Sequence, residues 1–460
     1  MPNRVAFNPN LPDITQSNAL WHRAEGLIPA GTQTLAKGPS QFSNGVAPKY
    51  LRKGKGARVW DVDGNEYLDY NMGVGPIILG YGHPAVDEAI RRQLEDGITF
   101  SLMHPLEVEL AERLRNCIPN TESVRFSKTG CDVTSAAVRL ARAFTRRDRI
   151  LCCGYHGWHD WYIAVTDRNA GIPTCVQDLT RTFQYNDIDS VVDAIDGDTA
   201  CVILEPFVFE RENGSFLTSL RKVCDRHRTL LIFDEMWTGF RCALGGAQEF
   251  FGVRSDLSLF SKAMANGMPI SAITGRGDVL SLLEKEVFFF TTFGGEALSL
   301  AAAVACIDFI RTHRVTDRIA AVGQRLLDGL QDLIDELGLD CVSVAGYPFR
   351  TAMNFSATMG DPLEMKTLVQ QELIRRGILW SGTHTLCFNH TEDDVDYTLA
   401  AYAEVLELLK EAVATRDIQG YLAGEPVQPV FRKMGNFNVK ARCVPNKESS
   451  RMTKSARELA

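Results

Sequence analysis

The chain has 460 residues, of which 45% are hydrophobic and 23% charged, and its net charge is −8. These values are ordinary for a globular protein with room for two or three lobes, and the acidic balance gives no reason to expect nucleic acid or an anionic membrane surface as a partner. The sequence has no apolar stretch long enough to span a bilayer and no signal-like N-terminus, so no membrane association is expected.

The twelve cysteines do not have the spacing of a disulfide or metal framework. Most lie inside apolar runs, as Cys152, Cys201 and Cys306 do, and no C-x-x-C sequence occurs. We therefore expect buried, reduced thiols and a cytoplasmic location. Only His156 and His159 have a metal-like spacing, and without a supporting cluster of acids or cysteines we expect no metal site.

The first part of the chain, residues 18–70, combines a short helical pattern, loops rich in Gly, Pro and Ser, and an Asp63-Gly64 pair between alternating residues. Such a pair predicts a hairpin, and hence a small antiparallel unit. Between about 105 and 310, short apolar runs alternate with helical patterns. This alternation predicts an α/β architecture, with a mainly parallel sheet covered by helices on both faces. The predicted strands are 124–127, 150–153, 201–204, 230–233, 257–260 and 270–274.

Residues 315–415 return to long helices with a few strands, which predicts a C-terminal lobe. From Phe431 onward the chain has eight Lys and Arg and two Glu, whereas the rest has a balance of −14. This tail is either a solvated segment or one that packs on the acidic body or on a partner subunit. The expected division is an N-terminal segment that forms part of a small domain, a large domain, a C-terminal small domain and a basic tail, at residues 1–70, 71–314, 315–418 and 419–460.

A carboxylate and a lysine stand at the ends of two consecutive predicted strands. The run 230–233 ends in Asp234-Glu235, and the run 257–260 ends in Ser261-Lys262, 28 residues after Asp234. At the carboxyl ends of parallel strands, side chains point into the ligand crevice. A lysine that can form an imine and an acid that can keep a pyridine nitrogen protonated fit pyridoxal 5′-phosphate (PLP). Either residue alone is more often a helix cap or a solvated charge, so this interpretation depends on further matches.

Four more segments carry suitable residues at strand ends or before helices. Residues 127–132 form a Gly-containing junction between a strand and a helix, where backbone N–H groups can approach phosphate. Residues 155–157 include an aromatic ring that can lie on a cofactor, and Glu205 ends another strand. Residues 291–295 precede a helix of small residues and can supply a hydroxyl to phosphate. The plainer alternatives are a turn, a core tyrosine, a paired buried carboxylate and a helix cap.

Together these segments resemble the class III (subgroup II) PLP-dependent aminotransferases of fold type I, and most of all the glutamate-1-semialdehyde 2,1-aminomutase branch. The resemblance runs from about residue 20 to about residue 409. Its most telling stretches read WDVDGN (60–65), GPIILG (75–80), YHG (155–157), FDE (233–235), TGFR (238–241), ALGGAQ (243–248) and GMP (267–269). The resemblance implies a large PLP-binding domain with a mainly parallel sheet, and a small α+β domain built from N- and C-terminal segments.

The resemblance also implies residue roles. Lys262 is expected to form the internal aldimine and to carry the proton, while Asp234 is expected to pair with the pyridine nitrogen. Tyr155 and Met236 are expected on the two faces of the ring, and Thr292 at the phosphate of the neighbouring subunit in a homodimer. The expected cofactor-binding residues are Lys262, Asp234, Thr129, Gly130, Cys131, Tyr155, His156, Glu205, Met236 and Thr292.

The chain departs from the aminomutases mainly where they bind substrate. It has Thr-Leu-Ala-Lys at 34–37 in place of Ser-Pro-Val-Arg, and Lys37 cannot reproduce the bidentate fork of an arginine. Val74 replaces a pocket tryptophan, and Trp237 stands where relatives have Met or Gln. The phosphate loop has also lost a hydroxyl, because it reads Thr-Gly-Cys at 129–131 in place of Ser-Gly-Thr. The expected substrate residues are Lys37, Val74, Trp237 and His384.

Because the cofactor residues match the family while the substrate residues differ, we predict an aminotransferase with its own substrate. It would move an amino group from an amino acid donor such as glutamate to a small carbonyl, keto-acid or keto-sugar acceptor. The nearest alternative is the intramolecular transfer of glutamate-1-semialdehyde 2,1-aminomutase, which Lys37 and Val74 argue against. A remote alternative is a non-catalytic scaffold of this fold, which the presence of Lys262, Asp234 and Tyr155 argues against.

Overall fold

The computed structural model describes residues 10–207 and 210–428, and its largest element is a seven-stranded sheet. Six strands run in the same direction, and only β10 is antiparallel to its neighbours. The prediction of a mainly parallel sheet is therefore confirmed. Across the sheet the order is β4 (Ser123–Ser127), β10 (Ser271–Gly275), β9 (Leu257–Phe260), β8 (Leu230–Asp234), β7 (Thr199–Leu204), β5 (Arg149–Cys153) and β6 (Thr180–Thr182).

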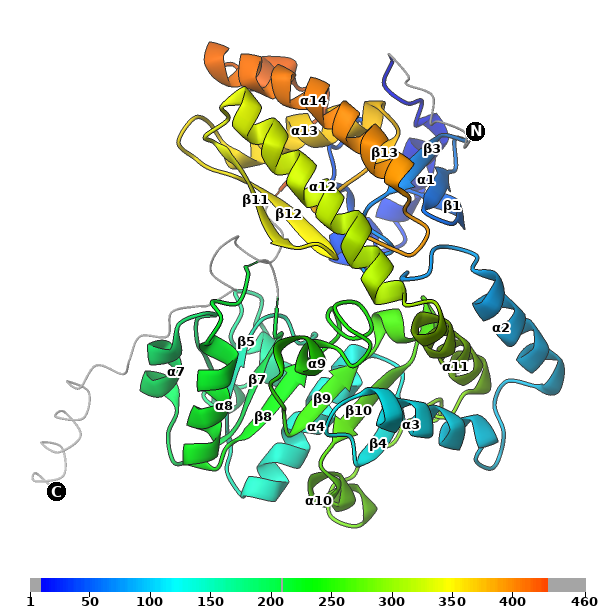
Figure 1. The fold of residues 1–460 in the computed structure, drawn as a ribbon, viewed down its shortest axis with the longest axis vertical. Helices are drawn as coiled ribbons and strands as arrows, with labels where there is room; N and C mark the ends of the chain where they lie inside the picture. The colour runs from blue at the N-terminus through cyan, green and yellow to red at the C-terminus, as the bar shows by residue number, and fades with distance from the viewer. Residues whose placement is uncertain (1–9, 208–209, 429–460) are drawn as a thin grey trace, which may run out of the picture.

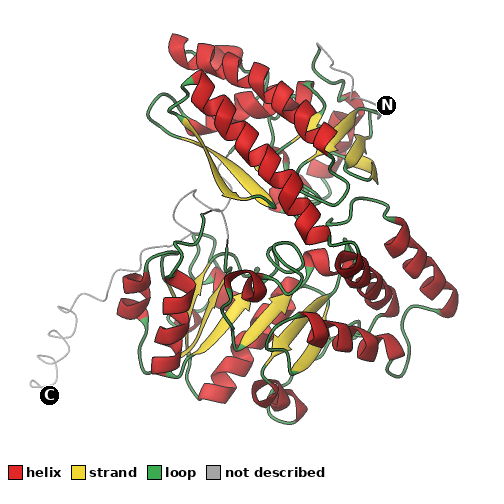
Figure 2. Cartoon of the chain, viewed as in Figure 1, coloured by secondary structure: helices red, strands yellow, loops and turns green. Residues whose placement is uncertain are grey.

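Helices cover both faces of this sheet because successive residues of its strands point to opposite sides. Ile232 of β8 packs in one core with residues of α4 (Gly130–Thr145). Its neighbours Leu231 and Phe233 pack in another core with residues of α8 (Phe216–His227). Central strands buried on both faces read as continuous apolar runs, which is why the sequence located them well. Figure 2 shows the helices in red around the yellow strands.

Two smaller sheets join segments from opposite ends of the chain. The strands β1 (Leu51–Lys55), β2 (Arg58–Asp61) and β3 (Glu66–Asp69) pair antiparallel, as predicted for this region. The strand β13 (Ile378–Leu379) extends this sheet through a parallel pairing with β3. A three-stranded sheet contains β11 (Val342–Tyr347), β12 (Arg350–Phe355) and β14 (Thr383–Thr385).

We call the seven-stranded sheet and its helices the large lobe, and the two smaller sheets with α1 and α12–α14 the small lobe; they occupy the lower and upper parts of Figure 1. No helix within the described residues is long and apolar enough to cross a bilayer.

The remaining α-helices are α1 (Thr15–Glu25), α2 (Pro84–Asp96), α3 (Pro105–Cys117), α5 (Asp160–Ile163), α6 (Thr174–Gln177), α7 (Ile188–Ala194), α9 (Ala247–Phe251), α10 (Gly277–Leu280), α11 (Ala297–Thr312), α12 (Val315–Leu337), α13 (Pro362–Arg375) and α14 (Glu392–Thr415).

The sequence did not predict β6. This strand has three residues, Thr-Arg-Thr, at the edge of the sheet, and its side chains are only partly buried beyond Thr180. Such a strand has no apolar run to mark it. The basic tail from Phe431 onward lies outside the described residues.

Candidate active site

The candidate site lies at the edge of the large sheet where its parallel strands end. The strands β8 and β9 are hydrogen-bonded neighbours, with Asp234 opposite Leu259, so Asp234 and Lys262 leave the sheet at the same edge. The strand β5 ends close to Tyr155, and β7 ends at Glu205. This is the edge at which open parallel sheets bind their ligands.

Asp234 is a buried carboxylate held by two donors. Its side chain is closed off from solvent, and the Oδ2 atom lies 2.8 Å from Nδ1 of His156. Its Oδ1 atom accepts a hydrogen bond of 3.1 Å from the backbone N–H of Met236. On the other side of the imidazole, Nε2 lies 3.1 Å from the carbonyl oxygen of Cys153. The His156 ring therefore fixes the orientation of Asp234 and anchors it to β5.

Glu235, the next residue, points elsewhere and has a structural role. Its carboxylate accepts the backbone N–H groups of Ala247, at 2.8 Å, and Gln248, at 3.2 Å, and also the hydroxyl of Thr238. Burial raises the pKa of Glu235 to about 7, although these donors counteract it. Of the two adjacent acids, Asp234 is the one that belongs to the site.

Lys262 begins a short 3-10 helix directly after β9 and has a left-handed backbone, with φ at 39°. A non-glycine residue in this region is strained, and strain of this kind concentrates at functional sites. The Nζ atom lies 4.1 Å from the ring centroid of Trp237. The structure thus brings Trp237, a predicted substrate residue, next to the predicted catalytic lysine.

The helix α4 begins at the same edge, directly after β4, and Thr129 caps it. The Thr129 hydroxyl accepts the backbone N–H of Asp132 at 3.2 Å, and the Asp132 carboxylate accepts the N–H of Thr129 at 2.8 Å. A long helix that starts with Gly130-Cys131 offers backbone N–H groups and a positive dipole end to an anion. Burial raises the pKa of the Cys131 thiol, so it stays neutral near pH 7 and does not repel an anion there.

The predicted site residues on β5 and β7 form one linked unit. The backbone N–H of Tyr155 donates to Oε2 of Glu205 at 2.8 Å, while the Tyr155 side chain remains 39% exposed. Glu205 is buried, and a Cβ added to Gly154 would lie 2.7 Å from its carboxylate. Glu205 therefore positions the loop that carries the partly exposed Tyr155 ring.

Met236 and Val74 lie near the same group of residues. Met236 contacts the start of α4, since a Cβ added to Gly130 would be 3.1 Å from its sulfur atom. Val74 has a φ of 72°, which is a strained value for a β-branched residue. The adjacent Gly75, with φ at 96°, lies so close to Trp237 that an added Cβ would be 2.3 Å from its ring.

The surroundings of three further predicted residues differ from one another. Lys37 is exposed in the 3-10 helix Leu35–Lys37 of the small lobe. Thr292 is exposed in the loop before α11. His384 is buried on β14, where Nε2 lies 2.8 Å from the Tyr402 hydroxyl and burial lowers the pKa of the imidazole to about 3. The geometry gives His384 a packing role within the small lobe.

Arg350, which the sequence did not predict as a site residue, lies beside the candidate site. Arg350 begins β12 of the small lobe, is 5% exposed, and has its guanidinium carbon 3.8 Å from the ring centroid of Trp237. Nothing in the local sequence marks this arginine, because its position depends on the packing of the two lobes.

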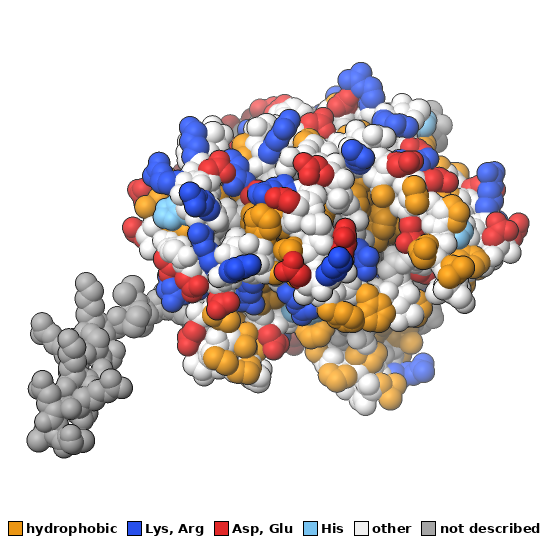
Figure 3. Space-filling model, turned by 90° about the horizontal axis from the view of Figure 1, so that it is seen from below, with side chains coloured by type: hydrophobic (Ala, Val, Ile, Leu, Met, Phe, Trp, Pro, Cys, Tyr) orange, Lys and Arg blue, Asp and Glu red, His pale blue; other side chains and the backbone are white. Residues whose placement is uncertain are grey.

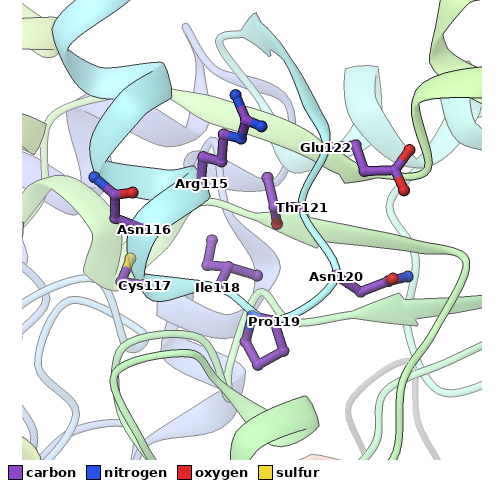
Figure 4. A pocket seen from close by; sticks show the side chains of 8 residues that line it. All are labelled: Arg115, Asn116, Cys117, Ile118, Pro119, Asn120, Thr121 and Glu122. Carbon is purple, nitrogen blue, oxygen red and sulfur yellow. The ribbon is translucent and has the colours of Figure 1, made fainter.

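An open depression of about 520 Å³ lies elsewhere, between the end of α3 and the start of β4, and is shown in Figure 4. Its lining, residues 115–122, precedes β4, whereas α4 and the candidate site follow the end of that strand. The depression is therefore at the opposite edge of the sheet. Among the described residues, no cluster of three or more His, Cys, Asp or Glu side chains is placed to hold a metal ion.

Comparison with known proteins identifies relatives over most of the chain. The family model Aminotransferase class-III matches residues 42–385. The 3-aminobutyryl-CoA aminotransferase of Cloacimonas acidaminovorans is 35% identical over 413 residues, which cover 86% of this chain and 98% of that protein. The glutamate-1-semialdehyde 2,1-aminomutase of Methanothrix thermoacetophila is 35% identical over 418 residues, or 85% and 96% of the two chains. Among solved structures, the PLP internal aldimine form of the FumI protein of Sphingopyxis sp. MTA144 superposes with a TM-score of 0.80 at 30% identity, covering 87% of this chain and 98% of that one.

Proposed function

Since this chain belongs to the class III aminotransferase family and is a PLP-dependent enzyme of that family, we propose that Lys262 is the residue that bonds to PLP. The proposed reaction transfers the amino group of an amino acid donor to a small carbonyl or keto-sugar acceptor. The observation that carries the residue assignment is the position of Asp234 and Lys262 at the ends of two hydrogen-bonded parallel strands. Family membership agrees with the family predicted from the sequence motifs.

The residues at this edge fit PLP. Gly130 and Cys131 open α4 and would hold the phosphate through their backbone N–H groups, with the Thr129 hydroxyl beside them. Asp234 would face the pyridine nitrogen as an anion oriented by His156. Tyr155 and Met236 would lie at the two faces of the ring. Glu205 would act indirectly, because it fixes the loop of Tyr155.

PLP supplies an electrophilic carbonyl carbon and a ring that accepts electron density from the reacting carbon. The protein supplies the proton transfers and the orientation. Once its amine is released by the donor, Lys262 can take a proton from the substrate carbon at Nζ and return it at another carbon, as a general base and then a general acid. Asp234 is buried against the His156 ring and the backbone N–H of Met236, which hold its carboxylate in one orientation.

Intramolecular amino transfer is the second candidate, because several similar proteins are glutamate-1-semialdehyde 2,1-aminomutases. Against it, Lys37 stands where these enzymes carry an arginine, and Val74 where they carry a tryptophan. The 3-aminobutyryl-CoA aminotransferase, which is equally similar in sequence, supports transfer between two substrates. We therefore retain the intermolecular reaction as the main proposal.

A homodimer with shared sites is the proposed assembly. The segment that carries Thr292 is rich in exposed aromatic side chains, since Phe288, Phe290 and Phe293 are 74%, 63% and 55% exposed. Exposed apolar side chains gathered in one segment are typical of a surface that another protein covers. Figure 3 shows hydrophobic side chains in patches on the face of the molecule seen from below. The mostly buried free cysteines also support a cytoplasmic location, which we propose as well.

Reductive trapping tests the lysine. Borohydride treatment of the holoenzyme followed by peptide mass mapping should find the pyridoxyl group on Lys262, and a label on another lysine would refute the assignment. Lys262→Ala should lose turnover, whereas Lys222→Ala, which alters an exposed lysine on α8, should not.

A donor and acceptor screen tests the reaction. Amino acid donors are added without any semialdehyde, and the released keto acid is measured. An aminotransferase should release keto acid in an amount equal to the enzyme sites when no acceptor is present, and continuously when one is added. Turnover of glutamate-1-semialdehyde alone, without keto-acid release from any donor, would favour the aminomutase.

A further inference from the structure

We propose that Arg350 binds the carboxylate of the substrate and thereby selects amino donors and acceptors that carry one. This inference rests on the proposed function above, since it concerns the substrate of the same site. It assigns the anion-binding role to a residue of β12 in the small lobe rather than to Lys37.

The first observation is the distance between two cationic groups that share one aromatic ring. The Nζ atom of Lys262 lies 4.1 Å from the Trp237 centroid, and the guanidinium carbon of Arg350 lies 3.8 Å from it. Both distances are measured to the same ring, so the Nζ atom of Lys262 and the guanidinium carbon of Arg350 are at most about 8 Å apart. Trp237 therefore connects the reacting lysine to an arginine from the other lobe.

A substrate amino acid is compatible with this upper limit. Aminotransfer brings the donor nitrogen close to Nζ of the lysine. In an α-amino acid the carboxylate carbon is two bonds from that nitrogen, roughly 2.5 Å, and a bidentate pair adds about 4 Å to the guanidinium carbon. The span that such a substrate needs is below the limit of about 8 Å, and a β-amino acid, which is one bond longer, also stays below it.

The second observation is that the strand register directs Arg350 and His384 to different faces. Arg350 is paired with Thr385, and the next residue, Thr351, is paired with His384. Since side chains of directly paired residues share a face and neighbours alternate, Arg350 and Thr385 lie on one face of the sheet, and Thr351 and His384 on the other. His384 points into the small-lobe core, whereas Arg350 contacts Trp237 of the large lobe.

The third observation is that the large lobe holds the hairpin of Arg350 rigidly. The rings of Tyr347 and Phe349 contact the Phe207 ring edge to face, at 4.5 and 5.6 Å between centroids. The Arg211 Nε atom donates to the carbonyl oxygen of Gly346 at 2.8 Å. A binding residue must be fixed by its surroundings to orient a ligand, and this hairpin meets that condition.

The burial of Arg350 favours it over Lys37 as the carboxylate ligand. The guanidinium is planar, always charged, and matches a carboxylate with two parallel hydrogen bonds. At 5% exposure it is little screened by water, while Lys37 is exposed. The face of Trp237 orients the guanidinium plane.

The experiment measures the preference for a carboxylate directly. The variants are Arg350→Met, Arg350→Lys, Lys37→Met and, as a matched control on the exposed end of α8, Arg226→Met. Each amino acid donor that reacts is compared with the amine in which a methyl group replaces the carboxylate, as isopropylamine does for alanine. We expect Arg350→Met to lower kcat/KM for the amino acid by about 100-fold, mainly through KM, and to change the value for the amine far less. Arg350→Lys should recover part of the loss, and Arg226→Met should behave as the wild type.

A binding measurement separates this inference from the proposed function. Glutarate has carboxylates but no amine, aldehyde or ketone group, so its binding to the holoenzyme can be followed by calorimetry without turnover. Binding at least 10-fold weaker in Arg350→Met than in the wild type supports the inference, even if no donor is ever found to react. Equal glutarate affinity and an unchanged ratio between amino acid and amine would overturn it while leaving the aminotransferase reaction intact. A loss confined to Lys37→Met would overturn it in favour of that lysine.

Discussion

The Nδ1 atom of His156 lies 2.8 Å from Oδ2 of Asp234, and both side chains are buried. The second ring nitrogen, Nε2, lies 3.1 Å from the carbonyl oxygen of Cys153. The two contacts fix the plane of the ring, and the ring in turn fixes the orientation of the Asp234 carboxylate.

His156→Gln tests this arrangement. The amide can donate to only one of the two acceptors, so Asp234 is oriented less firmly. We expect kcat to fall by about 10-fold with a smaller change in KM, because the carboxylate is no longer held in one position. His159→Gln is the matched control, since His159 contacts Ser135 instead. A wild-type kcat in His156→Gln would show that the reaction does not depend on this contact with Asp234.

Asp234→Asn should reduce the rate more than it affects the fold. The amide keeps the shape of the side chain but removes the negative charge that we propose faces the pyridine nitrogen of the cofactor. The loss concerns the transition state, so kcat should fall by about 100-fold with a smaller change in KM. Steady-state kinetics and the thermal unfolding midpoint check both parts, with Asp225→Asn on the exposed face of α8 as the control. Wild-type kcat in Asp234→Asn would contradict the role of the carboxylate.

The sheet and the position of Asp234 and Lys262 at one of its edges could be predicted from the sequence for a common reason. The strand β8 is apolar throughout and buried on both faces, so the run 230–233 marked it. Asp234 and Lys262 end adjacent parallel strands, and the edge at which such strands end is fixed by topology. By contrast, β6 is a short edge strand without an apolar run, and local patterns do not identify it.

Arg350 and His384 show what the sequence could not provide. Whether a side chain near a strand end reaches the site depends on the face to which it points, and that face depends on a register fixed by packing. The sequence suggested His384, which the register directs into the small-lobe core. Arg350 comes to Trp237 through contacts between the lobes, which join residues far apart in the chain.

The shared-site proposal predicts complementation between two defective variants. Lys262→Ala and Thr292→Val each impair one function of a site to which both subunits contribute. Mixed under conditions of subunit exchange, they should form heterodimers in which one of the two sites has both native residues and regains activity. Activity is followed together with PLP affinity, because Thr292→Val can act mainly on cofactor binding. Verified exchange without any recovery would place Thr292 outside the partner's site, and full activity of a monomer in sedimentation would refute the shared site.

Gly323→Ala should destabilise the small lobe, although alanine is the better helix former. A Cβ at this position of α12 would lie 1.8 Å from the carbonyl oxygen of Pro348, at the turn before Arg350. The helix gains about 0.5–1 kcal/mol, but overpacking against backbone costs about 1–3 kcal/mol, so the clash dominates. Gly329→Ala in the same helix is the control, because the atoms nearest to its Cβ belong to the Leu399 side chain and not to the backbone. We expect the midpoint of urea unfolding to fall in Gly323→Ala but not in Gly329→Ala. We also expect Gly323→Ala alone to raise KM for donors that carry a carboxylate. Equal unfolding midpoints for the two variants would contradict the clash.

His384 should make the small lobe sensitive to acid. Burial lowers the pKa of its imidazole from 6.5 to about 3 in the folded protein, whereas the unfolded chain keeps the ordinary value. Between these two values the unfolded state binds a proton that the folded state does not, so the free energy of unfolding falls as the pH is lowered from 6.5 towards 3. Above pH 6.5 both states are neutral at this residue and it contributes no pH dependence. The slope from this one group approaches about 1.4 kcal/mol per pH unit. The free energy of unfolding in urea should be measured at several pH values for the wild type and for His384→Gln. The difference between the two proteins should change with pH by that slope. A difference that is constant with pH would show that His384 is protonated equally in the folded and unfolded states.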